Sequence, residues 1–166
     1  MVWNVTAIGG VPSDDRYGVK GESDWLYIPA VAAPPTLDET EVEAGDLLTE
    51  AIQNIEGFNV TDTFTPAQDL SGGVSGNIWD GATVDGSALT FYKVRGGSDA
   101  SSLFTAGQLG YILHLPEGLA DNAEGKLWPI SRVGSVRPVA AISGYSLVRV
   151  SFGLNAPFDV TLPVST

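Results

Sequence analysis

Apolar and polar residues alternate along most of this 166-residue chain, and a period of two predicts β-strands. Turn residues separate the alternating stretches, among them 20 Gly and 10 Pro. Asp80-Gly81 and Asp85-Gly86 are dipeptides that favour tight hairpin turns. A series of about nine short strands divided by turns is typical of a β-barrel or a two-sheet sandwich. The predicted strands cover residues 2–8, 25–31, 58–64, 88–95, 109–115, 127–133, 138–142, 145–154 and 158–164.

One or two short helices are expected beside these strands. Thr36 and Glu39 have the spacing of a capping box, which predicts a helical turn over 37–43. Residues 46–56 fit a helix capped by Asp46 and equally fit an extended segment, so both alternatives stay open. Residues 98–106 predict a short helix that ends at Gly107. Glycine-rich residues 66–76 and polar residues 9–24 are expected to be loops.

Composition limits the class of protein. The length fits one domain over 1–166, and 43% hydrophobic with 17% charged residues is typical of a folded chain. The absence of cysteine excludes disulfides, cysteine-ligated zinc and cysteine nucleophiles. No stretch reaches the ~20 apolar residues of a membrane-spanning helix, and we expect no signal peptide at the N-terminus.

The net charge of −12 is unevenly distributed. Residues 21–92 hold thirteen acidic and no basic residues, whereas residues 93–166 hold six basic and five acidic ones (6 − 5 = +1). Proteins that bind nucleic acid tightly contact its phosphates through Lys and Arg, so tight nucleic-acid binding is not expected. The simpler interpretation of the charge is an acidic surface exposed to solvent. The more specific alternative is an acidic protein surface past which DNA slides without binding.

Candidate chemistry is sparse. His114 is the only histidine, so one chain offers neither a serine triad nor a multi-histidine metal site. Glu39, Glu41 and Glu43 alternate but lack the spacing of a calcium loop. The glycine-rich stretch 72–76 lacks the Lys-Ser/Thr of a phosphate loop. We therefore expect no catalytic, cofactor-binding or metal-binding residues, and no enzyme.

The order of motifs over residues 25–155 resembles the major tail, or tail tube, proteins of long-tailed bacteriophages. Pro35-Thr36, the acidic step Glu41–Gly45 and the segment Asp46–Ile55 stand in the order found in that family. The downstream half also resembles it in the segments 87–94, 103–112, 127–130 and 132–135.

The resemblance implies a tail-tube-type β-barrel or sandwich whose hexameric rings stack into a tube, with a long loop or terminal arm bridging adjacent rings. The tube would conduct DNA through its lumen without specific binding, and no membrane would be involved. Partners would be further copies of the chain, a tape-measure protein, a tail terminator and baseplate or tip proteins. The protein would reside in the virion after assembly in the host cytoplasm.

Within this implied architecture, residues 1–24 would form an N-terminal arm or loop and residues 33–57 a connector between subunits. We take seven residues as candidates for subunit contacts. They are Trp25, Tyr27, Thr36, Leu37, Val42, Leu47 and Leu48.

Two other classes remain open. Another virion protein, such as a capsid decoration protein or a tail terminator, would form trimers or single rings. A carbohydrate-binding β-sandwich would use some of the four Trp residues to stack on sugars.

Overall fold

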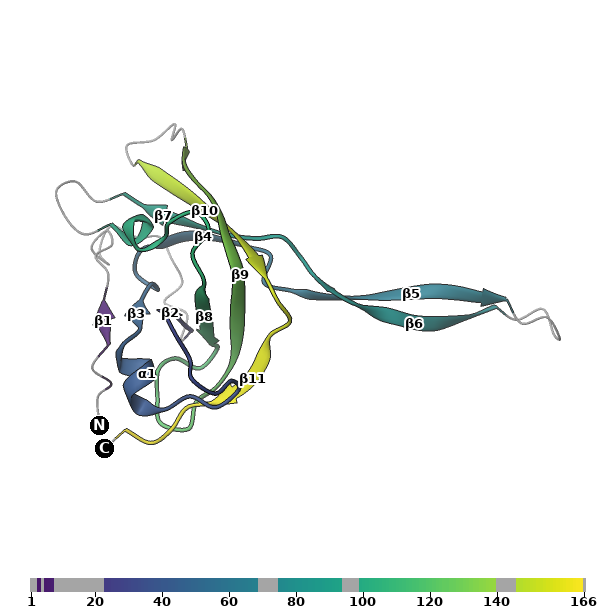
Figure 1. Ribbon diagram of the computed structural model, residues 1–166, viewed down its shortest axis with the longest axis horizontal. Coiled ribbons are helices and arrows are strands. Elements are labelled where there is room, and N and C mark those ends of the chain that lie inside the picture. The colour runs from purple at the N-terminus through teal and green to yellow at the C-terminus, as the bar shows by residue number, and fades with distance from the viewer. Residues whose placement is uncertain are drawn as a thin grey trace.

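The computed structural model is mainly β, as the sequence predicts, and it describes residues 3, 5–7, 23–68, 75–93, 99–139 and 146–165 (Figure 1). A nine-stranded sheet forms the body, and a separate two-stranded sheet projects from it. The strands are β1 (Thr6–Ala7), β2 (Asp24–Ile28), β3 (Asp46–Leu47), β4 (Ile52–Glu56), β5 (Val60–Gln68), β6 (Ser75–Val84), β7 (Ser87–Tyr92), β8 (Gly110–Leu115), β9 (Glu124–Val139), β10 (Leu147–Leu154) and β11 (Phe158–Thr161). The helical elements are α1 (Glu39–Glu43) and a 3-10 turn, η2 (Ala100–Leu103).

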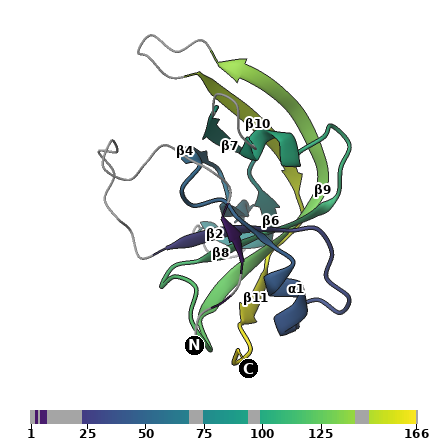
Figure 2. The same ribbon diagram turned by 90° about the vertical axis from the view of Figure 1, so that its left-hand side faces the viewer.

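The body is a curled sheet with the strand order β1-β3-β2-β8-β9-β10-β7-β4, and β11 pairs with β9 off this path. The sixteen-residue β9 is its longest strand, and it pairs with β8, β10 and β11. Residues 46–56 join the two ends, because β3 pairs with β2 and β4 pairs with β7. Between them the Leu48 N–H donates to the Trp25 carbonyl at 2.7 Å, and the Tyr92 N–H donates to the Ala51 carbonyl at 2.9 Å. This segment therefore bridges the two sides of the curled sheet and gives it the form of a barrel; Figure 2 shows the curled sheet from another side.

Two hydrophobic clusters lie on opposite faces of the central strands. On β2, Trp25 and Tyr27 point into the barrel, while Leu26 and Ile28 point outward. The outer cluster is covered by α1 and by segments near both ends of the chain, through Val42 among others. Burial on both faces explains why the sequence of β2 is apolar at successive positions. The inner cluster comprises Trp25, Tyr27, Leu48, Ala51, Phe58, Leu89, Phe91, Ala100, Phe104, Ile112, Trp128, Ile130, Val133, Val148, Val150 and Phe152.

The helix predicted over 37–43 exists but is capped differently. Asp38 is the N-cap, and it shares a capping box with Glu41 rather than Thr36 with Glu39. The Glu41 N–H donates to Asp38 Oδ1 at 2.7 Å, and the Asp38 N–H donates to Glu41 Oε2 at 3.1 Å. Asp is as good an N-cap as Thr, and starting two residues later leaves Leu37 free to enter the outer cluster.

Residues 46–56, for which helix and strand were both open, are extended apart from a turn at 48–51. Pairing with the two ends of the sheet satisfies the backbone, and it buries Leu48 and Ala51 in the inner cluster. The helix predicted over 98–106 is only the 3-10 turn η2, capped by Asp99, because residue Phe104 turns extended and enters the core. Ser98, the first residue of the predicted helix, lies outside the described residues.

Several strand boundaries differ from those predicted. Two predicted strands, 127–133 and 138–142, fall on one strand, β9, which ends at Val139, and residues 140–142 lie outside the described residues. Residues 66–68 and 75–76 are strand rather than loop. The last strand is shorter than predicted and ends at Thr161, before Pro163. Of the N-terminal strand the structure describes β1, and most of the predicted arm over 1–24 lies outside the described residues.

Candidate assembly surfaces

The described residues offer no cluster of metal ligands. No group of three or more His, Cys, Asp and Glu among them could hold a metal ion. The His114 ring stacks on Trp25 with 4.2 Å between ring centroids, and burial lowers the pKa of His114. No helix in the described part of the chain is long and apolar enough to cross a membrane. Two exposed surfaces of the described residues are candidates for contact with another protein.

Five of the seven predicted contact residues lie in the cores of the chain itself. Trp25, Tyr27 and Leu48 belong to the inner cluster, and Leu37 and Val42 belong to the outer one. Of the remaining two candidates, Thr36 is exposed and Leu47 is half-buried. The five buried side chains shape the fold from within, and a direct contact of Thr36 or Leu47 with another subunit stays a prediction.

Tyr27 shows how such a candidate is used internally. Its hydroxyl donates to the Leu109 carbonyl at 3.2 Å and accepts from Gln108 Nε2 at 2.6 Å. Burial raises the pKa of Tyr27. The side chain therefore ties β2 to the segment before β8 and leaves no polar atom for a partner.

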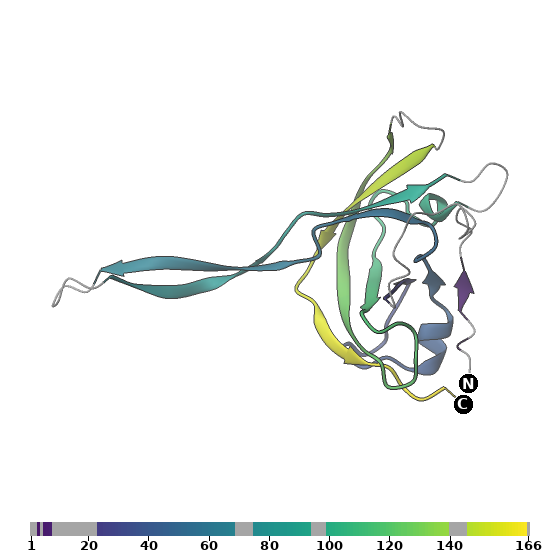
Figure 3. The same cartoon turned by 180° about the vertical axis from the view of Figure 1, so that it is seen from behind.

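The most exposed element is the β5–β6 hairpin, which we call the arm. Its strands pair only with each other, as a two-stranded antiparallel sheet, among the described residues. Figures 1 and 3 show the arm projecting away from the barrel, with no other element beside its outer part. A ribbon of nine residues at about 3.4 Å each spans roughly 30 Å.

The register gives the arm two different faces, because directly paired residues share one face of a sheet. Val60 pairs with Val84, Asp62 with Ala82, and Phe64 with Trp79. This face, the apolar face of the arm, carries Phe64 and Trp79 at 55% and 61% exposure, and the Trp79 Nε1–H donates to Asp62 Oδ1 at 3.2 Å.

The opposite face of the arm is mainly a ladder of threonines. Thr61 pairs directly with Thr83, and Thr63 and Thr65 lie on the same face because they follow Thr61 at every second residue of β5. Hydroxyls of this threonine face donate to acids of the arm, as from Thr65 to Asp80 at 3.0 Å. Ile78 is the one large apolar side chain paired into this face. The arm is therefore amphipathic, although neither face is covered by the described part of the chain.

A β-bulge at Asp80 decides which face Trp79 occupies. Thr63 pairs with Gly81 and the next residue, Phe64, pairs with Trp79, so Asp80 is the extra residue. Gly81 has φ 128°, a conformation that glycine adopts without strain. Asp80-Gly81 is thus a bulge rather than the predicted hairpin turn, and Asp85-Gly86 joins β6 to β7, which belong to different sheets. Without the bulge, Trp79 would lie among the threonines.

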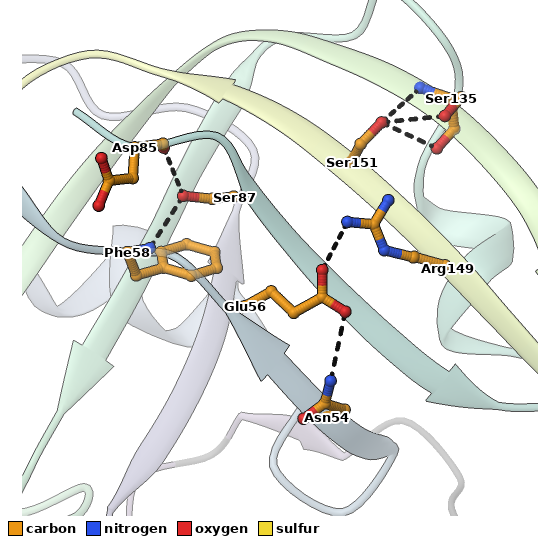
Figure 4. Close-up of polar contacts among 8 residues, drawn as sticks. All are labelled: Asn54, Glu56, Phe58, Asp85, Ser87, Ser135, Arg149 and Ser151. Atoms are coloured by element: carbon orange, nitrogen blue, oxygen red, sulfur yellow. Dashed lines mark hydrogen bonds and ion pairs between the residues drawn. The ribbon is translucent and has the colours of Figure 1, made fainter. Parts of the chain in front are cut away.

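A second exposed surface is the outward face of β9 and β10, which we call the arginine face. Arg137 of β9 lies directly opposite Arg149 of β10. The Arg149 guanidinium bonds Glu56 Oε2 at 2.5 Å (Figure 4), and this bond lowers the pKa of Glu56 and raises that of Arg149. Arg137 and Arg132 have no ion pair with any described residue.

Small residues lie beside the arginines on β9 and β10. The Ser151 hydroxyl accepts from the Ser135 N–H at 2.9 Å (Figure 4), and a Cβ on Gly134 would come within 2.8 Å of the Ser151 hydroxyl. In β7 the Ser87 hydroxyl accepts from the Phe58 N–H at 2.9 Å, and this bond ties the residues just before the arm to β7. The arginine face is therefore exposed and carries positive charge.

The sequence analysis did not single out the arm, which is the exposed hairpin of the structure. The alternation from Phe58 to Phe64 was visible, but the bulge that pairs Phe64 with Trp79 carries no signal beyond one Asp-Gly pair. Of the four Trp residues, Trp3, Trp25 and Trp128 are buried at 6%, 7% and 4% exposure. Only Trp79 is available on the surface, which weakens the sugar-stacking alternative.

Comparison with known proteins gives a likeness in fold alone. No protein-family model matches the chain, and no curated protein matches it. One chain in the cryo-EM structure of the anti-feeding prophage (AFP) baseplate, 6-fold symmetrised, is similar with a TM-score of 0.50 at 12% identity, over 87% of this chain and 93% of that one. A chain in the cryo-EM structure of the anti-feeding prophage cap, the tube-terminating cap, has a TM-score of 0.49 at 12% identity, over 91% and 99%.

Proposed function

We propose that this protein is a structural subunit of a phage-tail-like particle and that it assembles into hexameric rings stacked as a tube. The observation that carries the proposal is the barrel fold, similar along almost its whole length to a chain of a six-fold symmetrised baseplate. The ordered motifs that resemble tail tube proteins support it independently. Its action is geometric, since no bond is made or broken.

A ring of this kind uses heterologous contacts, in which one surface of each subunit meets a different surface of the next. The closed barrel with two unlike exposed surfaces, the arm and the arginine face, suits such an arrangement. Each ring would contact further rings, a tape-measure protein, a terminator and baseplate or tip proteins. The protein would act in the virion, after assembly in the host cytoplasm.

The charge of the chain bears on the proposed passage of DNA. Six copies would carry 6 × −12 = −72 charges per ring. An acidic lumen would repel DNA at short range, within a Debye length of about 8 Å. The arginine face cannot supply such a lining, so an acidic lumen would be formed from residues 21–92, which carry no basic residue.

One alternative has support of its own. The similar structure is a baseplate, so the chain could complete a single six-fold ring without extending into a tube. Both versions predict a hexamer of about 104 kDa, from 6 × 17.3 kDa. They differ in whether rings stack.

Sedimentation and negative-stain electron microscopy of the purified full chain, with and without a crowding agent, test the proposal. Six-fold annular particles would support it, and hollow tubes built from them would favour the tube over the single ring. A strictly 17.3 kDa species at every concentration, or a closed trimer, would overturn it.

A further inference from the structure

The arm is an element that the described part of the chain leaves without cover. An isolated two-stranded hairpin is marginal in water, and three strands or a packed face are needed for independent stability. Phe64 and Trp79 nevertheless lie side by side on one face, both more than half exposed. Contiguous exposed apolar side chains of this size mark an interaction surface. The apolar face of the arm is therefore a docking surface.

The charge of the arm identifies the chemistry of its partner. No Lys or Arg occurs in residues 60–68 or 75–84, and Asp62 is the one acid on the apolar face. Asp62 accepts from Trp79 Nε1 but has no cationic partner among the described residues. A carboxylate beside two aromatic rings would be desolvated on docking, and a desolvated carboxylate needs a cation opposite it.

The arginine face carries a cation, Arg137, that lacks a carboxylate partner among the described residues. Like charges directly opposite on neighbouring strands destabilise a sheet. Glu56 compensates Arg149, but no described carboxylate compensates Arg137. Val139, two residues along β9 on the same side as Arg137, is 38% exposed and adds an apolar contact.

We propose that the apolar face of the arm docks on the arginine face of a second copy of this chain, with Asp62 paired to Arg137. The arm points away from its own barrel, so the acceptor belongs to another molecule (Figure 3). A roughly 30 Å ribbon can cross several strands of that barrel at their spacing of about 4.8 Å. The inference deepens the proposed assembly by naming which two surfaces meet.

Cysteine cross-linking between two separately purified proteins tests the contact, because the natural chain has no cysteine background. One protein carries Ala82→Cys on the apolar face of the arm, and the other, with a larger tag, carries Val139→Cys on the arginine face. Mild oxidation of the mixture should give the mixed disulfide. Thr63→Cys, on the threonine face, is the matched control and should give at least about five-fold less product. Equal yields from the two arm positions would overturn the proposed orientation.

Charge reversal tests the specific pair. Asp62→Arg and Arg137→Asp should each weaken association at least tenfold in sedimentation, which corresponds to about 1.4 kcal/mol. Combining both in one chain should restore association to within about threefold of the natural protein. Asp85→Arg, which changes charge by the same amount on the threonine side of the arm, is the matched control. Single variants without effect, or a double variant weaker than either single one, would overturn the pairing.

The same samples separate this inference from the proposed function. Six-fold rings that form while the Cys pair fails to cross-link would refute the docking and leave the tail role standing. Cross-linked copies that never form six-fold rings would support the docking and refute the hexameric tail role.

Discussion

Replacing Leu48 with alanine should destabilise the isolated subunit strongly, although the sequence marks this residue as a contact candidate. Leu48 is fully buried where residues 46–56 cross between the two ends of the sheet. Its N–H also bonds the Trp25 carbonyl, so side chain and backbone both hold the barrel closed at this point.

The expected cost follows from burial. Leu-to-Ala changes at fully buried sites cost about 3–5 kcal/mol, because transfer free energy is lost and a cavity remains. We take about 3 kcal/mol for Leu48→Ala. The neighbouring Leu47→Ala, at a half-buried site, should cost about 1 kcal/mol.

Urea unfolding of the monomer, followed by tryptophan fluorescence at a concentration too low for assembly, measures both variants. With a slope of about 2 kcal/mol per M, the midpoint should fall by about 1.5 M for Leu48→Ala and about 0.5 M for Leu47→Ala. A Leu48→Ala monomer as stable as the natural chain, but unable to assemble, would refute the account of Leu48 as a core residue.

Three further predictions concern the body of the barrel. Gly57→Ala should destabilise the monomer by about 2 kcal/mol or more in urea unfolding, since Gly57 has φ 76° and a Cβ would lie 2.6 Å from the Gly86 carbonyl oxygen. The control Gly86→Ala, whose Cβ would meet no atom within 4 Å, should change the free energy of unfolding by less than about 0.5 kcal/mol. Equal effects of the two substitutions would contradict this prediction. Ser87→Ala should cost about 1–3 kcal/mol in thermal or urea unfolding, because it leaves the buried Phe58 N–H without its acceptor, and a neutral result would count against that bond. Burial lowers the pKa of His114, so the folded state disfavours the protonated ring, and stability should be lost as the pH falls below about 6.5. Urea unfolding curves between pH 7.5 and 5 should show a larger loss of stability for the natural chain than for His114→Gln. Equal losses for the two proteins would refute the effect.

The sequence predicts the class of fold because alternation is a local property. The strands around Leu89 and Ile112 appear where their apolar period indicates, with boundaries within one to three residues. Residues 46–56 fit two local conformations equally well. The choice between them is made by long-range pairing with β2 and β7, which no local pattern records.

The same limit explains why the arm was not predicted. Glycines near residue 72 made the outer part of the arm look like a loop, whereas cross-strand bonds continue to the pair Gln68–Ser75. The Asp80-Gly81 pair favours a turn in isolation, yet pairing on both sides of it leaves room only for a bulge. Leu48 is apolar, and apolar character alone cannot distinguish a core residue from an interface residue.

The central claim, a six-fold structural assembly, is tested most directly by cryo-electron microscopy of particles formed by the full-length chain. The account predicts rings of six identical barrels, stacked into a tube in its preferred form, with the arm of each barrel lying on a neighbouring copy. Assemblies of any other symmetry, or a chain that stays monomeric under every assembly condition, would contradict it.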